Sequence, residues 1–273
     1  MSLSPPLGLA VALAITLAIT LAAPPSLAGT HPDVAPAGTG AAGGDYSGTA
    51  CSQGAAWNGR LQGGIPMEIK GEHYQLHGGR ARQRTAWGTP DMVALLKRAA
   101  KVVGTSVDGP PLVLGSISDQ DGGKLGRHKS HQTGRDVDIL FYVRDPSGAR
   151  KRALGFYEFD GEGHCLHKRC RGWTFDVQRN WWLVRTMVWS KRPEVQWIFV
   201  SAPLQRLMLA YAARRGELPE IVRRAKKVMA EPGNSSPHAD HFHVRVYCST
   251  ADKRRGCRDG GPLWDWIRKP ARS

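Results

Sequence analysis

Histidines that could bind a metal or transfer protons gather in two short segments of the chain. They are His128 and His131 in the first segment, and His238, His241 and His243 in the second. The first segment runs on to a carboxylate, Asp138. Imidazole nitrogens and carboxylate oxygens are common ligands of catalytic zinc, and imidazole also exchanges protons near neutral pH. The two segments therefore predict a metal or acid–base site, provided that the fold brings them together.

The alternation of side chains along a strand decides which of these residues share a face. Residues two apart on a strand point to the same side of a sheet. His241 and His243 therefore project side by side, and Asp136 and Asp138 share a face of their own strand. If the two strands are neighbours, imidazoles and a carboxylate converge.

Asp138 lies inside an apolar strand, where an unpaired carboxylate is costly to bury, so it needs a partner. Gly134 permits a sharp turn, which allows the loop residue His131 to fold back beside this strand. His131, Asp138 and His243 then form a three-ligand set with a fourth position left for water, as in catalytic zinc sites. The alternatives are that the aspartate belongs to a turn or a helix cap, and that each histidine is an ordinary surface or core residue.

His241 shares its face with His243 and therefore points into the same cavity. Bound zinc lowers the pKa of its water, and a nearby imidazole can take or return a proton at working pH. The spacing alone leaves open whether His241 is a further ligand or the proton-handling group.

The elements that must position these segments are indicated by apolar spacing and by capping residues. Thr89 and Pro90 begin a helix as N-cap and first residue, Gly104 is expected to end it, and Asp176 is the N-cap of another helix. Further helices are expected at 203–215 and 219–230, and strands at 112–117, 137–143, 195–200 and 241–247. Helices and strands that mix without regular βαβ alternation favour an α+β fold.

The N-terminus indicates export. Residues 7–23 form an uncharged apolar run, which Pro24 and Pro25 follow. Ser26 and Ala28 fit a cleavage site before residue 29, so residues 1–28 are predicted to be a signal peptide. The alternative is an uncleaved membrane anchor. No second long apolar run follows, so we expect no membrane span after cleavage and a periplasmic location.

Five cysteines agree with an oxidising compartment. Cys165 and Cys170 lie close in sequence, as do Cys248 and Cys257, and each pair could close a small loop as a disulfide. A zinc ribbon is disfavoured because the chain has no C-x-x-C pair. Cys51 is left without an evident partner.

The charge of the chain predicts an anionic partner. The formal net charge is +15 and the pI is near 10, which concentrates polyanions at the surface. Nucleic acid, anionic lipid and acidic envelope polymers all fit this charge. No zinc-finger or RRM signature supports nucleic acid, and the absence of H-E-x-x-H disfavours a thermolysin-like protease.

The string S-H-Q-T-G-R-D-V-D-I at residues 130–139, together with H-x-x-H-x-H-V at 238–244, resembles the penicillin-insensitive murein endopeptidases. That family belongs to a wider group with lysostaphin-type enzymes, D-Ala-D-Ala metallopeptidases and the hedgehog signalling domain. The similarity runs from about Asn58 to Cys248. It implies a small central antiparallel sheet flanked by helices. Together with the composition of the chain, it suggests boundaries at 1–28 (signal peptide), 29–56 (Gly/Ala/Pro-rich linker), 57–250 (zinc endopeptidase domain) and 251–273 (basic irregular tail).

Carried over position by position, the resemblance implies that His131, Asp138 and His243 bind Zn²⁺ and that His241 is the catalytic histidine. It places His128 close to the metal, as a candidate further ligand.

Other residues correspond to the family more loosely. A second, outer metal would be held by Asp160 and His164, although their spacing is one residue longer than the family's pattern. His238 is expected near the substrate. Cys248 occupies the position of a disulfide cysteine in the family, which supports a Cys248–Cys257 bond, whereas the expected C-terminal partner of a cysteine like Cys51 is absent.

The resemblance also implies the reaction, which is hydrolysis of the peptide cross-links of peptidoglycan at the bond from D-alanine to meso-diaminopimelate. Arg127 and Arg135 flank the site and could meet substrate carboxylates, or they could be solvated loop charges. The alternatives are a D,D-carboxypeptidase or dipeptidase on the same scaffold, and a zinc-containing binding protein without catalysis.

Overall fold

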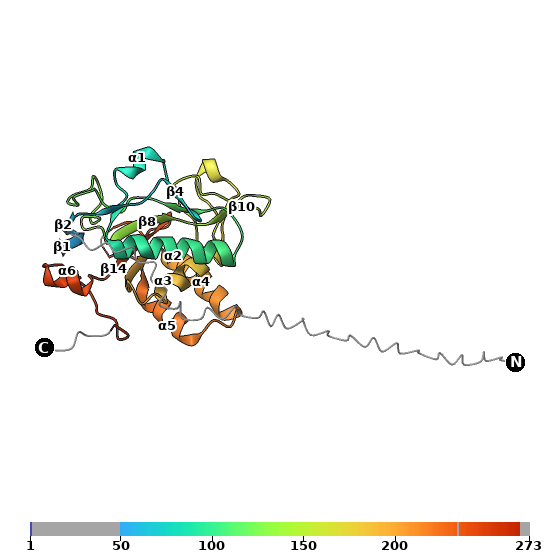
Figure 1. Cartoon of the computed structure of the whole chain (residues 1–273). Helices are drawn as coiled ribbons and strands as arrows, with labels where there is room; N and C mark the ends of the chain where they lie inside the picture. Colours follow the sequence, from blue (N-terminus) through green and yellow to red (C-terminus); the bar gives the residue numbers. More distant parts are fainter. Residues whose placement is uncertain (2–49, 234, 268–273) are drawn as a thin grey trace. The chain divides into compact units, whose positions relative to one another are not determined.

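The computed structural model describes residue 1 and residues 50–233 and 235–267 of the chain (Figure 1). The predicted signal peptide lies outside these residues, except for Met1. Contacts divide the chain into residues 1–44 and 45–273, and the described helices and strands belong to the second unit. Within the described ranges, every helix is too short or too polar to cross a membrane.

A mixed sheet forms the centre of the second unit, and in the described residues its strand order is β13-β12-β14-β8-β7-β5-β4. Its strands are β4 (Lys70–Gly71), β5 (Tyr74–Leu76), β7 (Leu112–Leu114), β8 (Asp136–Leu140), β12 (Val195–Phe199), β13 (Met229–Ala230) and β14 (His241–Val246). The smaller sheets contain β1 (Cys51–Ala55), β2 (Asn58–Gln62), β3 (Ile65–Pro66), β6 (Trp87–Gly88), β9 (Val143–Arg144), β10 (Arg150–Lys151) and β11 (Thr174–Phe175).

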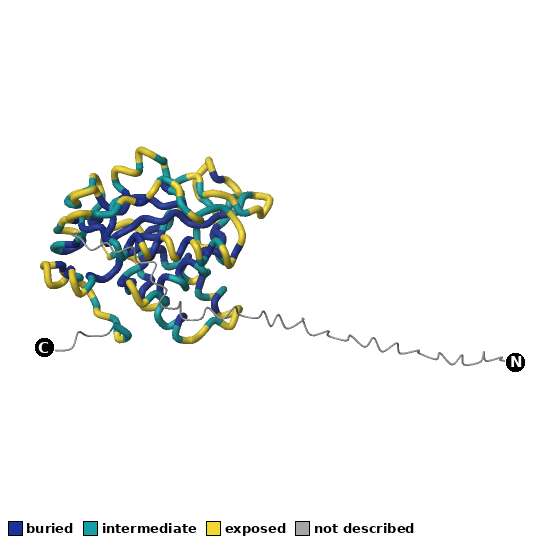
Figure 2. Tube along the Cα trace, viewed as in Figure 1, coloured by how far each residue is buried: buried dark blue, intermediate teal, exposed yellow. Residues whose placement is uncertain are grey.

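Four helices cover one side of this sheet, as Figure 1 shows: α2 (Pro90–Ser106), α3 (Val177–Val188), α4 (Ala202–Arg214) and α5 (Pro219–Val228). Two short helices, α1 (Arg80–Gln83) and α6 (Thr250–Arg254), and a 3₁₀ turn at Lys168–Cys170 complete the fold. Buried residues follow the central strands and the helices packed on them, whereas exposed residues lie mainly in the loops (Figure 2). The predicted α+β class is confirmed.

The expectation of an antiparallel sheet holds for the middle strands, but two strand pairs are parallel. β14 pairs antiparallel with both β8 and β12, whereas β5 pairs with β7 and β12 with β13 in parallel. Parallel neighbours require a crossover connection. The chain supplies one through α2 between β5 and β7, and another through α4 and α5 between β12 and β13.

Capping residues mark the helix starts correctly, but two predicted helix ends are wrong. The Thr89 side chain accepts a hydrogen bond from the backbone N–H of Met92, and Asp176 accepts one from Arg179. Helix α2 passes through Gly104 instead of stopping there. A Cβ at Gly104 would lie 2.2 Å from the Nδ1 atom of His73, so the glycine is needed for close packing. The helix expected at 219–230 ends at Val228, because Met229–Ala230 pair with β12 as strand β13.

The N-terminal strand and the C-terminal segment are joined beside the sheet. Arg135 has a buried side chain that donates to Ser52 Oγ at 3.0 Å and to the carbonyl of Val246 at 2.9 Å. It also donates to the carbonyl of Arg258. Strand β1 thus lies within the range expected to be linker, and helix α6 within the range expected to be an irregular tail.

The cysteine pairs form as the sequence suggested. Disulfides join Cys165 to Cys170 and Cys248 to Cys257. Cys51 is a free, buried cysteine on β1. The second disulfide closes the loop that carries α6 and holds it beside β1, where Asp252 accepts a hydrogen bond from the Ser52 N–H.

Substitution of Gly134 tests whether close packing requires a glycine in the turn before β8. Its φ is +68°, and a Cβ would lie 2.9 Å from Leu61 Cδ1 and 3.0 Å from the Thr89 nitrogen. Gly134→Ala should lose about 1–2 kcal/mol of unfolding free energy from the left-handed backbone and roughly 1–3 kcal/mol more from crowding. Gly148, with φ of +80° and open space within 4 Å of where a Cβ would lie, is the control for backbone strain alone. Urea unfolding of both alanine variants measures the difference, and equal losses would contradict the crowding.

Candidate metal centre

The pairing of β8 with β14 brings the two histidine-containing segments together. In this antiparallel pair His243 lies opposite Asp138, and Arg245 lies opposite Asp136. Opposed residues on one face of an antiparallel pair are close enough for their side chains to interact. The register therefore places one carboxylate against an imidazole and the next against a guanidinium.

Four imidazole nitrogens surround the buried carboxylate of Asp138. Its Oδ1 lies 3.1 Å from His131 Nε2, 3.3 Å from His243 Nδ1 and 3.3 Å from His241 Nε2. Its Oδ2 lies 3.7 Å from His128 Nδ1. The side chain of Asp138 is only 3% exposed, so these rings replace water around it.

The ring nitrogens of His131 and His243 that point away from Asp138 donate hydrogen bonds to other acceptors. His131 Nδ1 lies 2.8 Å from the carbonyl oxygen of Ile117, and His243 Nε2 lies 2.8 Å from Asp136 Oδ1. A carbonyl or a carboxylate can only accept, so each of these nitrogens carries the proton. The neutral form of either ring then presents a lone pair toward Asp138. Outer acceptors of this kind fix the tautomer and orientation of metal-binding histidines.

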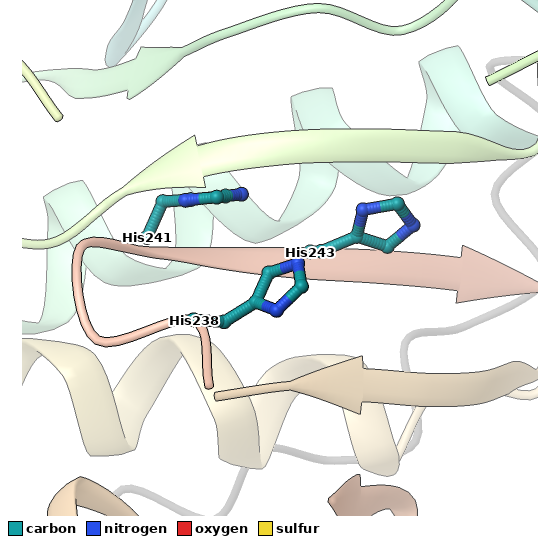
Figure 3. A group of neighbouring side chains, drawn as sticks. All are labelled: His238, His241 and His243. Atoms are coloured by element: carbon teal, nitrogen blue, oxygen red, sulfur yellow. The ribbon is translucent and has the colours of Figure 1, made fainter. Parts of the chain in front are cut away.

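His241 and His238 are oriented in the same manner. His241 Nδ1 lies 2.7 Å from Asp240 Oδ1, and His238 Nδ1 lies 2.8 Å from the carbonyl oxygen of Ser236. Figure 3 shows His241 and His243 projecting from strand β14 and His238 reaching in from the loop before it. The predicted shared face of His241 and His243 is present.

The backbone is strained at two of these histidines. His131 has φ of 69° and His238 has φ of 56°, in the left-handed region that non-glycine residues rarely occupy. Such strain persists only where the surroundings determine the conformation, and it is concentrated at functional sites. The bonds from these two rings to Ile117 and Ser236 help to hold the conformation.

Burial and charge act in opposite directions on the two carboxylates. Burial alone would raise the pKa of Asp138, but His131, His241 and His243 outweigh it and hold the pKa well below the usual range. Burial would likewise raise the pKa of Asp136, but Arg245 and His243 keep it low. Both groups are therefore carboxylates at neutral pH.

The histidines divide into two kinds. Burial, together with the positive charge of neighbouring histidines, lowers the pKa of His128 and of His238 to about 4. Burial would also lower the pKa of His241, but its hydrogen bonds to Asp138 and Asp240 raise it to about 9. His128 and His238 thus offer neutral nitrogens, whereas His241 holds a proton firmly in the absence of a metal.

This donor set fits a divalent metal ion. The ligand atoms of His128, His131 and Asp138 lie within 4.8 Å of one another, and so do those of His238, His241 and His243. Lone pairs of neutral imidazoles that face a carboxylate at 3.1–3.3 Å repel it unless a proton or a cation lies between them. Nitrogen and oxygen donors in this number are those that zinc takes in catalytic sites.

Four predicted site residues, Asp160, His164, Arg135 and Arg127, lie outside the two ligand groups. Asp160 and His164 lie in one turn, with His164 Nδ1 3.7 Å from Asp160 Oδ2. Asp160 also accepts hydrogen bonds from the backbone N–H groups of Glu162 and His164, and an outer metal at this pair stays a prediction. Arg135 is buried against Ser52 and the C-terminal segment, so its guanidinium is committed to structural contacts. Arg127 is exposed in the loop beside His128.

Sequence reasoning missed the residues that orient the histidines. It placed Asp136 on the face of Asp138 but gave it no role, and it did not single out Asp240. One signal was present: Arg245 follows His243 by two residues, as Asp136 precedes Asp138 by two. Paired antiparallel, this pattern sets opposite charges across the strands. No comparable sequence pattern marked Phe156, whose ring centroid lies 5.2 Å from that of His241.

The chain is similar to known proteins over most of its length. The family model described as penicillin-insensitive murein endopeptidase matches residues 52–264. A penicillin-insensitive murein endopeptidase of Escherichia coli O1:K1 / APEC is 36% identical over 240 residues, which cover 82% of this chain and 78% of the relative. The protein of the same description from Escherichia coli strain SMS-3-5 / SECEC gives the same values. That from Escherichia coli O157:H7 strain EC4115 / EHEC is 30% identical with the same coverage.

Asp136→Asn tests whether the carboxylate of Asp136, which accepts a hydrogen bond from the proposed ligand His243, supports metal binding. The amide keeps an acceptor for His243 but removes the charge that balances Arg245. Metal affinity, titrated against a competing chelator, should fall by about 10–100-fold, as for other outer partners of metal ligands. Asp121→Asn, at an exposed loop carboxylate, is the matched control and should bind as the wild type does. Unchanged affinity in a folded Asp136→Asn protein would show that this carboxylate has no such role.

Proposed function

The chain belongs to the penicillin-insensitive murein endopeptidase family, and from that premise we propose that it is a zinc-dependent D,D-endopeptidase of the bacterial cell envelope. Its substrate would be the peptide cross-link of peptidoglycan, at the bond from D-alanine to meso-diaminopimelate. The observation that supports this proposal best is the convergence of His131, His241 and His243 on the buried carboxylate of Asp138.

His131, Asp138 and His243 are the proposed zinc ligands. In His131 and His243, one ring nitrogen faces the site and the other donates a hydrogen bond to Ile117 or to Asp136. This is the arrangement expected of metal-binding imidazoles. When bound, zinc supplies a Lewis acid that polarises the scissile carbonyl and makes water more acidic. His128 is more exposed and its nitrogen lies farther from Asp138, so we assign it to the rim of the site as a candidate further ligand.

His241 is the proposed catalytic histidine. Asp240 accepts from its Nδ1, so its Nε2 is directed into the site. A carboxylate behind an imidazole stabilises the protonated ring, which allows Nε2 to hold a proton and to donate it to a leaving amine or a developing oxyanion. His238, 4.9 Å from His241 between ring centroids, would bind substrate or support that exchange.

The compartment follows from the substrate and from the cysteines. Peptidoglycan lies outside the cytoplasmic membrane, and two disulfides agree with an oxidising compartment. We propose export to the periplasm by the signal peptide predicted at residues 1–28. The formal net charge of +15 would favour adsorption to the anionic polymer.

Digestion of cross-linked muropeptide dimers tests the activity. The purified mature protein should convert dimers to monomers, because hydrolysis of the D-alanyl bond separates the two peptide stems. Prior treatment with a chelator should abolish conversion, and added Zn²⁺ should restore it. Chromatography of the products also distinguishes the alternatives, since a carboxypeptidase would release free D-alanine and leave the dimers joined. The endopeptidase proposal is falsified if zinc-loaded protein leaves dimers intact.

Substitution of the two strand histidines separates metal binding from proton transfer. His243→Ala should lose metal and activity together, because it removes a proposed ligand. His241→Ala should retain most of the metal but lose roughly 10²–10⁴-fold in rate, the range typical of a lost acid–base group. Metal content and dimer cleavage are measured on the same preparations. His167→Ala, at an exposed ring outside both ligand groups, is the control, and a fully active His241→Ala protein would contradict the assigned role.

A further inference from the structure

A pocket lies near the proposed metal site, at the β4–β5 edge of the central sheet. It has a volume of about 370 Å³, within the range of small-ligand sites. Strands β4 and β5 contribute Lys70 and Gln75 to its wall, the turn after β5 contributes His77, and the segment after β10 contributes Arg152 and Leu154. None of its described lining residues belongs to the two ligand groups.

The pocket is positively charged and contains no acidic lining residue among its described walls. Lys70 and Arg152 are exposed basic residues at its wall. Burial lowers the pKa of His77, and the positive charges of Arg82 and Arg152 lower it further. The amide nitrogen of Gln75 is buried without a hydrogen-bond acceptor in the described residues, which leaves an unpaired donor in the wall.

A single aromatic side chain joins this pocket to the metal site. The ring of Phe156 lies edge-on to His241 at 5.2 Å and to His77 at 5.6 Å between centroids. It can approach so closely because residue 115 is glycine: a Cβ there would lie 2.9 Å from both Phe156 Cζ and Asp138 Cβ. Phe156 therefore contacts both the proposed catalytic histidine and the pocket residue His77.

We propose that this pocket is a substrate subsite that binds a free carboxylate of the acidic peptide stem, with Arg152 as its principal contact. This inference rests on the proposed function and specifies how that function selects its substrate. Peptide stems of cross-linked murein carry several carboxylates on D-configured residues, and a guanidinium can bind a carboxylate through paired hydrogen bonds. The apolar wall residues Ile69, Leu76 and Leu154 would pack against the methylene groups of the stem.

The test compares acidic and neutral forms of the same ligand. Cross-linked dimers and monomeric muropeptides are prepared with free carboxylates and, separately, with the carboxylates converted to amides. Arg152→Gln, Arg152→Lys and the wild type are assayed for kcat/KM on the dimers, and for binding of the monomers by calorimetry. Arg214→Gln, at an exposed position on α4, is the matched control. Metal content and thermal unfolding of each variant establish that the fold and the metal site are intact.

Arg152→Gln should lower kcat/KM for the acidic dimer about tenfold, mainly through KM, and should weaken binding of the acidic monomer by a similar factor. The amidated ligands should be unaffected by the substitution, Arg152→Lys should be intermediate, and Arg214→Gln should match the wild type. Equal effects of Arg152→Gln on acidic and amidated ligands, or no effect on either, would overturn the subsite. If the wild type cleaves no dimer, the proposed function fails instead, and the calorimetric comparison still decides whether Arg152 binds a carboxylate.

Discussion

The buried carboxylate of Asp138 is the constraint on which the rest of the site depends. A carboxylate with 3% exposure needs compensating partners, because burial of an unpaired charge is costly. The chain supplies four imidazoles, and the ring nitrogens of His131, His241 and His243 lie within 3.1–3.3 Å. Such an arrangement is electrostatically acceptable only with shared protons or a bound cation, so the need to bury this one charge and the capacity to bind a metal have the same origin.

The surrounding structure holds the imidazoles in place from behind. Ile117 and Asp136 fix the tautomers of the two proposed histidine ligands, His131 and His243, while Asp240 orients the ring of His241. Asp136 is in turn balanced by Arg245 across the same strand pair. The candidate metal centre is therefore an extension of the β8–β14 pairing, and any slip in that register would separate the carboxylates from their partners.

Access to this centre is shaped by parts of the chain that carry no catalytic group. Gly115 leaves room for the Phe156 ring, which contacts His241 of the candidate metal centre and His77 of the positively charged pocket. Elsewhere in the fold, Arg135 secures β1 and the C-terminal segment against β14. A residue expected to meet substrate thus stabilises the fold, and an arginine that the sequence did not single out, Arg152, lines the pocket.

The sequence by itself determined the chemistry of the candidate centre and most of its elements. Alternation on one strand set His241 beside His243, caps at Thr89 and Asp176 marked helix starts, and an apolar strand made a partner for Asp138 necessary. These are local properties, set by neighbours within a few residues. Only the tertiary structure decided that Asp136 faces His243 and that Arg135 is buried against the C-terminal segment. It also decided that Phe156 packs against His241 and that Arg152 lines the neighbouring pocket. Such outcomes depend on strand register and close packing between residues far apart in the chain, which local spacing does not encode.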